Sequence, residues 1–172
     1  MNPVWINHRG SDLLQGDILS RSAVPIIGNQ FGQGGVEEQI DVEERDLIII
    51  TQSCDLENAK NVFAALCPVH SLGNFEKINP QFATKGNWEH VRKGRMEGLH
   101  MLASPEKPQD NRLALVVDFR QIFSLPLDYL ERHAESIGDR WRLQSPYLEH
   151  FSQAFARFFM RVGLSVEIPP FK

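Results

Sequence analysis

The chain has 172 residues, of which 42% are hydrophobic and 23% charged, and we expect a single globular domain over residues 1–172. Its formal net charge of −4 argues against a dedicated nucleic-acid-binding protein, because such proteins usually carry a basic excess. The sequence has no signal-peptide pattern, no apolar run long enough to cross a membrane and only two cysteines, so we expect a cytoplasmic protein with reduced thiols.

The first predicted strand begins at Ile18, after an irregular segment over residues 1–15. Residues 23–27 continue this strand, and Pro25 indicates a sheet edge or a bulge because proline lacks an amide proton. Residues 28–35 contain four glycines and predict a flexible loop. They lack the Gly-Lys-Ser/Thr ending that a phosphate-binding loop requires.

The most apolar stretch of the chain is the predicted central strand over residues 47–51. It is preceded by a possible strand over residues 36–41 and an acidic turn over residues 41–44. Residues 55–60 predict a second turn, and residues 62–68 a second apolar strand. Two apolar runs joined by a short polar connection are typical of an antiparallel pair.

The second half of the sequence predicts a long insertion over residues 71–98, with a short helix near residues 87–93. Further predicted elements are strands over residues 99–102, 113–117, 122–125 and 141–143, a loop over residues 104–111 and a short helix over residues 127–134.

An amphipathic helix over about residues 146–162 is predicted near the C-terminus, with Ser145 as its N-cap and Gly163 as its stop. Its apolar residues follow helical spacing on one face: Leu148, Phe151, Phe155, Phe158, Phe159 and Val162.

Cys54 and Asp55 directly follow the central strand, where a thiolate could act as a nucleophile if a histidine lay nearby. The alternative interpretation is a small buried cysteine beside an aspartate that caps its own turn. A four-ligand zinc site would need Cys54, Cys67, His70 and His100 to meet from three segments, and the spacing does not favour a metal site.

Asp118 and Arg120 flank Phe119 at a strand end and therefore point to one side of the sheet, as a phosphate-binding pair or a simple ion pair. A basic segment surrounds Trp88, so single-stranded nucleic acid could bind there by charge and stacking; a solvated loop is the alternative. The basic residues of this segment are Lys85, Arg92, Lys93 and Arg95.

Four segments in this order resemble the PemK/MazF-like toxin family and the related CcdB branch. They are Gly-Asp-Ile at residues 16–18, a strand that begins at Arg45, a strand that ends at His70 and a late strand that ends at Asp118. The resemblance implies a mainly β, SH3-like bent antiparallel barrel over about residues 14–132. It also implies a homodimer that cuts single-stranded RNA without metal or cofactor.

The sequence departs from that family at the positions that matter for chemistry. Asp46 stands where a proline usually follows the catalytic arginine, here Arg45, and His70 stands where the family has its threonine. The run Ile-Thr-Gln-Ser-Cys-Asp-Leu is not a toxin motif; it resembles a signature of bacterial proteins of similar length that have no established activity.

Three hypotheses follow from these residues. The first is a bacterial stress or defence module that binds a protein or nucleic-acid partner without catalysis. The second is a metal-independent endoribonuclease using Arg45 and His70, and the third is a thiol or zinc enzyme centred on Cys54. Arg45 and Cys54 would lie roughly 27 Å apart along an extended strand, so at most one of the two enzyme hypotheses can hold.

Overall fold

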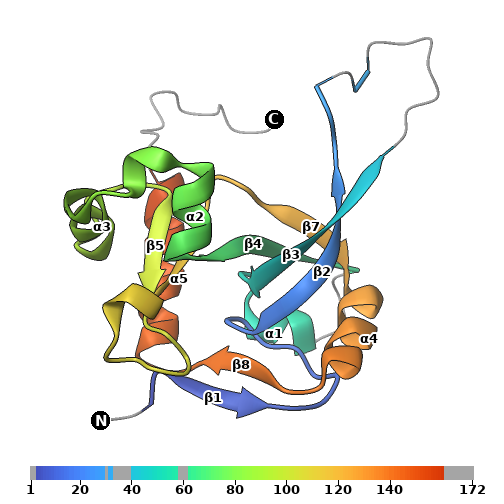
Figure 1. Ribbon diagram of the computed structural model, residues 1–172. Coiled ribbons are helices and arrows are strands. Elements are labelled where there is room, and N and C mark those ends of the chain that lie inside the picture. The colour runs from blue at the N-terminus through green and yellow to red at the C-terminus, as the bar shows by residue number, and fades with distance from the viewer. Residues whose placement is uncertain (1–2, 30, 33–39, 58–61, 161–172) are drawn as a thin grey trace, which may run out of the picture.

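The computed structural model describes residues 3–29, 31–32, 40–57 and 62–160 (Figure 1). The described residues are 34% helix and 33% strand, so the expectation of a mainly β chain is corrected to a mixed α and β fold. The strands are β1 (Trp5–His8), β2 (Ile18–Ile26), β3 (Asp41–Ile49), β4 (Phe63–Ser71), β5 (Leu99–Leu102), β6 (Leu115–Asp118), β7 (Phe123–Pro126) and β8 (Arg140–Leu143). The α-helices are α1 (Ser53–Glu57), α2 (Leu72–Ile78), α3 (Lys85–Arg92), α4 (Leu127–Ile137) and α5 (Tyr147–Phe159).

Strand β4 is the hub of the main sheet, because it pairs with β3, β6 and β7. The strand order is β2-β3-β4-β6-β5, with β7 on β4, and every pairing is antiparallel. Strands β2 and β5 form the two ends of this order, so the described residues do not close into a barrel. The predicted antiparallel pairing of the two most apolar runs is confirmed, with Ile48 opposite Cys67.

The β2–β3 hairpin extends away from the body of the molecule as a two-stranded arm (Figure 1). Pro25 lies on an edge strand, as predicted, and the register shifts between Leu19 and Ser22. The predicted acidic turn over residues 41–44 is wrong, because these residues form the exposed first half of β3 and pair with β2. Residues 30 and 33–35 of the predicted glycine-rich loop and residues 36–39 of the strand predicted after it lie outside the described residues.

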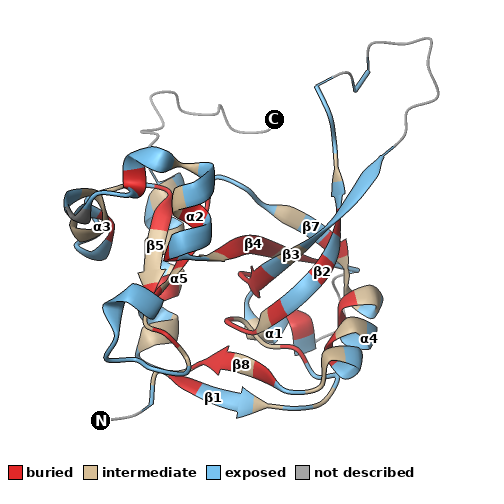
Figure 2. Ribbon diagram, viewed as in Figure 1, coloured by how far each residue is buried: buried red, intermediate tan, exposed pale blue. Residues whose placement is uncertain are grey.

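The central strand is buried on both faces, which explains why its sequence is a continuous apolar run rather than an alternating one (Figure 2). Leu47 and Ile49 point into a core that α4 covers, and Ile48 and Ile50 point into a second core that α5 covers. A third core under α2 and α3 contains Phe75.

The helices differ from the predictions mainly at their ends. Residues 53–57 form the short helix α1, so the turn predicted from Asp55 onward is wrong there, and residues 58–61 lie outside the described residues. The insertion holds two helices, α2 and α3, of which only the second was predicted. Helix α5 begins at Tyr147 with Pro146 rather than Ser145 as its N-cap, and Gly163 lies outside the described residues.

The N-terminal segment is not wholly irregular, in contrast to the expectation for residues 1–15. Trp5 begins β1, which pairs with β8 in a separate two-stranded sheet. The Trp5 side chain is buried, and its indole N–H donates to the carbonyl of Ala103 at 2.8 Å. Among the described residues, no helix has the length and apolar character needed to span a lipid bilayer.

Candidate functional site

Arg45 and His70 line one open cavity of about 510 Å³ on the main sheet. The backbone pairing of β3 with β4 ends where Leu47 faces Pro68, and continuing this antiparallel register by two residues places Arg45 opposite His70. Residues opposite each other in an antiparallel pair have side chains on the same face. Local strand register therefore brings together two residues that lie on different strands, and we call this cavity the Arg45–His70 cleft.

Further polar residues that the sequence did not single out line the Arg45–His70 cleft, among them Arg21, Asn74 and Lys77. Arg21 lies at the register shift of β2. Its φ is 51°, a backbone conformation that residues other than glycine rarely adopt. Its backbone N–H donates to Asp46 Oδ1 at 2.9 Å. The apolar pattern of β2 is interrupted by the sequence Ser-Arg-Ser, which was the available signal for this bulge.

Arg45 is held by a neighbouring carboxylate on its own strand. Its Nη2 atom donates to Glu43 Oε2 at 2.6 Å, and the Arg45 side chain is 27% exposed. The two residues are two positions apart on a strand and so lie on one face. A ligand phosphate would have to replace or share this contact.

His70 is half-buried and rests against the ring of Phe75, with the ring centroids 5.6 Å apart. Burial lowers the pKa of His70 below its ordinary value of 6.5. The charges of Asp118 and Asp46 oppose this shift, whereas the charge of Arg45 adds to it. His70 is therefore a neutral imidazole near pH 7, able to accept a proton.

Asp118 and Arg120 form an ion pair, one of the two interpretations of their spacing. Arg120 donates through Nε and Nη2 to the two carboxylate oxygens of Asp118, each at 2.7 Å. This bond raises the pKa of Arg120. Asp118 is buried, whereas Arg120 is about half exposed, and neither is among the described residues that line the Arg45–His70 cleft.

Trp88 and Arg92 line a different cavity, between α2, α3 and β5. Arg92 donates to both carboxylate oxygens of Glu89 at 3.0 and 2.8 Å. Lys85 is the first residue of α3, and its side chain lies outside the described part of the structure. Trp88 and Arg92 are not among the described residues that line the Arg45–His70 cleft.

Cys54 and Asp55 lie on α1, and neither is among the described residues that line the Arg45–His70 cleft. The Cys54 thiol is exposed, and Sγ lies 3.8 Å from Gln52 Oε1 and 3.9 Å from Asp55 Oδ1. Its exposure contradicts the interpretation of Cys54 as a small buried cysteine.

The four residues considered for zinc are not brought together. Cys67 is fully buried, and burial raises the pKa of its thiol to about 12, which disfavours the thiolate that metals bind. Burial also lowers the pKa of His100 to about 4. Within the described part of the chain, no three histidine, cysteine, aspartate or glutamate side chains are placed to hold a metal ion.

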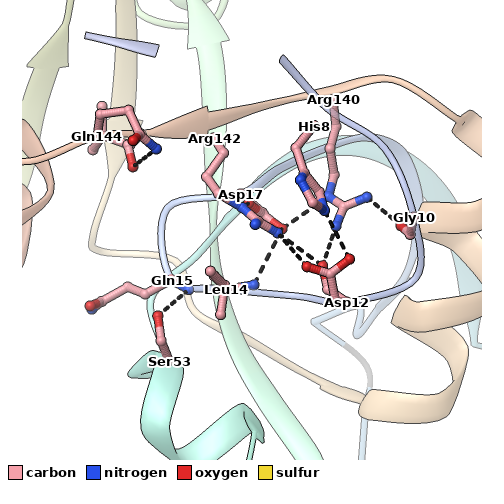
Figure 3. Close-up of polar contacts among 11 residues, drawn as sticks. His8, Gly10, Asp12, Leu14, Gln15, Asp17, Ser53, Arg140, Arg142 and Gln144 are labelled. Carbon is pink, nitrogen blue, oxygen red and sulfur yellow. Dashed lines mark hydrogen bonds and ion pairs between the residues drawn. The ribbon is translucent and has the colours of Figure 1, made fainter. Parts of the chain in front are cut away.

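A buried charge cluster surrounds Asp17, which the sequence indicated only as part of the segment Gly-Asp-Ile at residues 16–18. Figure 3 shows its carboxylate facing the guanidinium groups of Arg140 and Arg142. The backbone carbonyls of Gly10 and Asp12 accept further bonds from these two arginines. Asp17 is 0% exposed, so the cluster has a structural role in joining the N-terminal loop to β8.

Comparison with models of known protein families gives no match, and comparison with curated proteins gives none either.

Proposed function

We propose that the Arg45–His70 cleft binds single-stranded RNA and that the protein is a metal-independent endoribonuclease. The observation that carries this proposal is the convergence of Arg45 and His70 on one cavity. The ribonuclease hypothesis requires both side chains to reach one phosphate, so Arg45 and His70 on opposite sides of the sheet would have excluded that hypothesis.

The two side chains suit cleavage next to a ribose 2′-hydroxyl. An imidazole nitrogen of His70 takes the hydroxyl proton, the 2′-oxygen attacks the adjacent phosphorus, and the bond from phosphorus to the 5′-oxygen breaks. The products are a 2′,3′-cyclic phosphate and a strand with a 5′-hydroxyl, whose oxygen takes a proton from water. Arg45 stabilises the charge that develops on the non-bridging oxygens.

The charge balance of the cleft favours short-range contacts over long-range attraction. Among the described residues that line it, the cations are Arg21, Arg45 and Lys77, and the carboxylates are Glu43, Glu44 and Asp46. Because these charges cancel formally, the affinity for RNA is expected to be modest. Each phosphate that displaces a carboxylate from a cation makes binding sensitive to salt.

We extend the proposal to fold and biological role. The antiparallel sheet organised around β4 is proposed to be an open relative of the SH3-like toxin barrel. A role in bacterial stress or defence then predicts that expression of the protein arrests growth, and that expression of the His70→Asn variant does not.

The test is incubation of the purified protein with a fluorescently labelled single-stranded oligoribonucleotide in excess EDTA. Cleavage should give 5′-hydroxyl and cyclic phosphate ends, and the same sequence with 2′-O-methyl riboses should stay intact. His70→Asn and Arg45→Gln should each lower the rate by about 100-fold or more. Arg132→Gln, which removes an exposed cation on α4, is the matched control and should cleave at the unaltered rate.

The pH dependence provides a second readout. Because burial lowers the pKa of His70, the rate should be constant above pH 7 and fall only at pH values below 6.5, where the imidazole becomes protonated. Equal rates for His70→Asn and the unaltered protein would exclude His70 as the base.

A second candidate function is binding without cleavage, and the bond between Glu43 and Arg45 favours it. A phosphate or carboxylate of a partner could exchange for the Glu43 carboxylate with no bond broken in the partner. Binding that depends on Arg45 but leaves every oligonucleotide intact would select this alternative.

A further inference from the structure

A second cavity, of about 590 Å³, lies between α2, α3 and β5. Gly73 and Glu76 of α2 line it, whereas Asn74 and Lys77 of the same helix line the Arg45–His70 cleft. Helix α2 thus separates the two cavities. We call the second one the Trp88 cavity, and the inference drawn from it does not depend on cleavage elsewhere.

The Trp88 ring is fixed in the wall of this cavity. Its indole N–H donates to Glu76 Oε1 at 2.7 Å, and the ring packs against Phe82 and Phe75 with centroids 5.1 and 5.8 Å apart. The side chain is half-buried, and Leu72 and Met101 add apolar surface beside it. A rigid aromatic wall with apolar neighbours suits a flat ring that stacks on it.

Among the described residues that line the cavity, the two arginines differ in their ion pairing. Arg92 is engaged by both carboxylate oxygens of Glu89, and this bond lowers the pKa of Glu89 to about 2. The guanidinium of Arg112 has no ion pair or side-chain acceptor among the residues that the structure describes. An anionic group on a ligand would fill that role.

We propose that the Trp88 cavity binds a nucleotide, with the base stacked on Trp88 and the phosphate held by Arg112. Glu76 can accept a second hydrogen bond from an exocyclic amino group of the base, and Asn111 adds an amide at the cavity edge. A purine with an amino group is therefore preferred over uracil, which has none.

Calorimetric titration of the full chain with GMP, guanosine and UMP tests this proposal. GMP should bind about tenfold more tightly than either guanosine or UMP, because each lacks one of the proposed contacts. Arg112→Gln should weaken GMP about tenfold and leave guanosine unchanged. Arg112 is exposed, so this variant should fold. Arg132→Gln is its control, because it removes the same charge from α4, whose residues are not among the described lining of the cavity.

A short single-stranded oligoribonucleotide separates a free nucleotide from one within RNA. Suppose that Arg112→Gln weakens the binding of both GMP and the oligoribonucleotide. If the unaltered protein then binds the oligoribonucleotide more tightly than GMP, the natural ligand is an RNA strand; if the two affinities are equal, it is a mononucleotide. The proposal is overturned if GMP does not bind, or if Arg112→Gln and Arg132→Gln bind GMP with the same affinity. It is also overturned if argininamide, a cationic probe for the carboxylates of Glu76 and Glu89 in the lining, binds and GMP does not.

The two cavities are distinguished by one further variant. If Arg45→Gln weakens GMP and Arg112→Gln does not, the nucleotide occupies the Arg45–His70 cleft, which overturns this inference and leaves the RNA proposal standing. If Arg112→Gln alone weakens GMP and no RNA is cleaved, the inference stands and the ribonuclease proposal fails.

Discussion

Asp17 and Arg142 are 125 residues apart in the sequence and form a bidentate ion pair in the interior. Arg142 Nε lies 2.5 Å from Asp17 Oδ1, and Arg142 Nη2 lies 2.9 Å from Asp17 Oδ2. Arg140 Nε adds a third bond to the same carboxylate at 2.9 Å. The Asp17 carboxylate is therefore a counter-charge shared by two buried guanidinium groups, and it links the end of the N-terminal loop to β8.

Replacement of Asp17 by asparagine should lower the free energy of unfolding by about 3–5 kcal/mol, because two buried arginines lose their shared counter-charge. Urea denaturation followed by circular dichroism measures this change. Asp12→Asn is the matched control, since its carboxylate is 63% exposed and 3.5 Å from Arg142 while its backbone carbonyl still accepts from both arginines. A loss under 1 kcal/mol for Asp17→Asn would show that the cluster does not stabilise the fold.

The stability of the protein should fall in mild acid because of His100. Burial lowers the pKa of this imidazole to about 4, so the unfolded chain takes up the proton at a higher pH than the folded protein does. Stability is therefore fully present above about pH 6.5 and is lost as the pH falls toward 4. Between pH 7 and pH 5 this group should remove about 2 kcal/mol.

The variant that checks this prediction is His100→Leu, which places a side chain that cannot be protonated beside Phe119 and Phe151. Its unfolding free energy, measured by urea titration at pH 7 and pH 5, should depend less steeply on pH than that of the unaltered protein. His90→Gln, at an exposed position of α3, should keep the original pH dependence. Identical slopes for all three proteins would rule out His100 as the source.

Arg21→Gly should separate stability from binding. Glycine adopts a φ of 51° without the steric penalty that Arg21 carries, so the unfolding free energy should rise by up to about 1 kcal/mol. The same change removes a cation from the Arg45–His70 cleft, so the affinity for single-stranded RNA should fall several-fold.

Urea denaturation and fluorescence anisotropy measure the two effects of Arg21→Gly. Arg21→Lys is the control, because it keeps both the charge and the unfavourable backbone conformation. If the glycine variant binds RNA as well as the lysine variant does, Arg21 has no part in binding.

Glu43→Gln should increase the affinity for RNA, because it removes the carboxylate that holds Arg45 at 2.6 Å. Both side chains are partly exposed, so the unfolding free energy should change by less than about 1 kcal/mol. Glu44→Gln removes an equal charge from the same cleft without freeing Arg45, and its effect on affinity should be smaller. Anisotropy titrations at two salt concentrations compare the variants, and equal gains would mean that only the net charge matters.

The pairing of β3 with β4 was predictable because both strands are short apolar runs joined by a polar segment. The register, which places Arg45 opposite His70 when it is continued by two residues, came only from the structure, because the connection between the strands contains α1. The exposed half of β3 was not predictable either, since residues 41–44 are acidic and resemble a turn. They form a strand only because β2 supplies the partner backbone.

Sequence by itself determined the elements whose pattern is local: the central apolar strand, α4, and the apolar face of α5, where Phe151 is fully buried. Tertiary structure alone decided the contacts between distant segments. The alternation of Arg140 and Arg142 on β8 signals two side chains on one face, but only folding places Asp17 between them. Likewise, the packing of α3 against α2 decides that Trp88 and Arg112 share a cavity apart from Arg45, because short-range patterns carry no information about which surfaces meet.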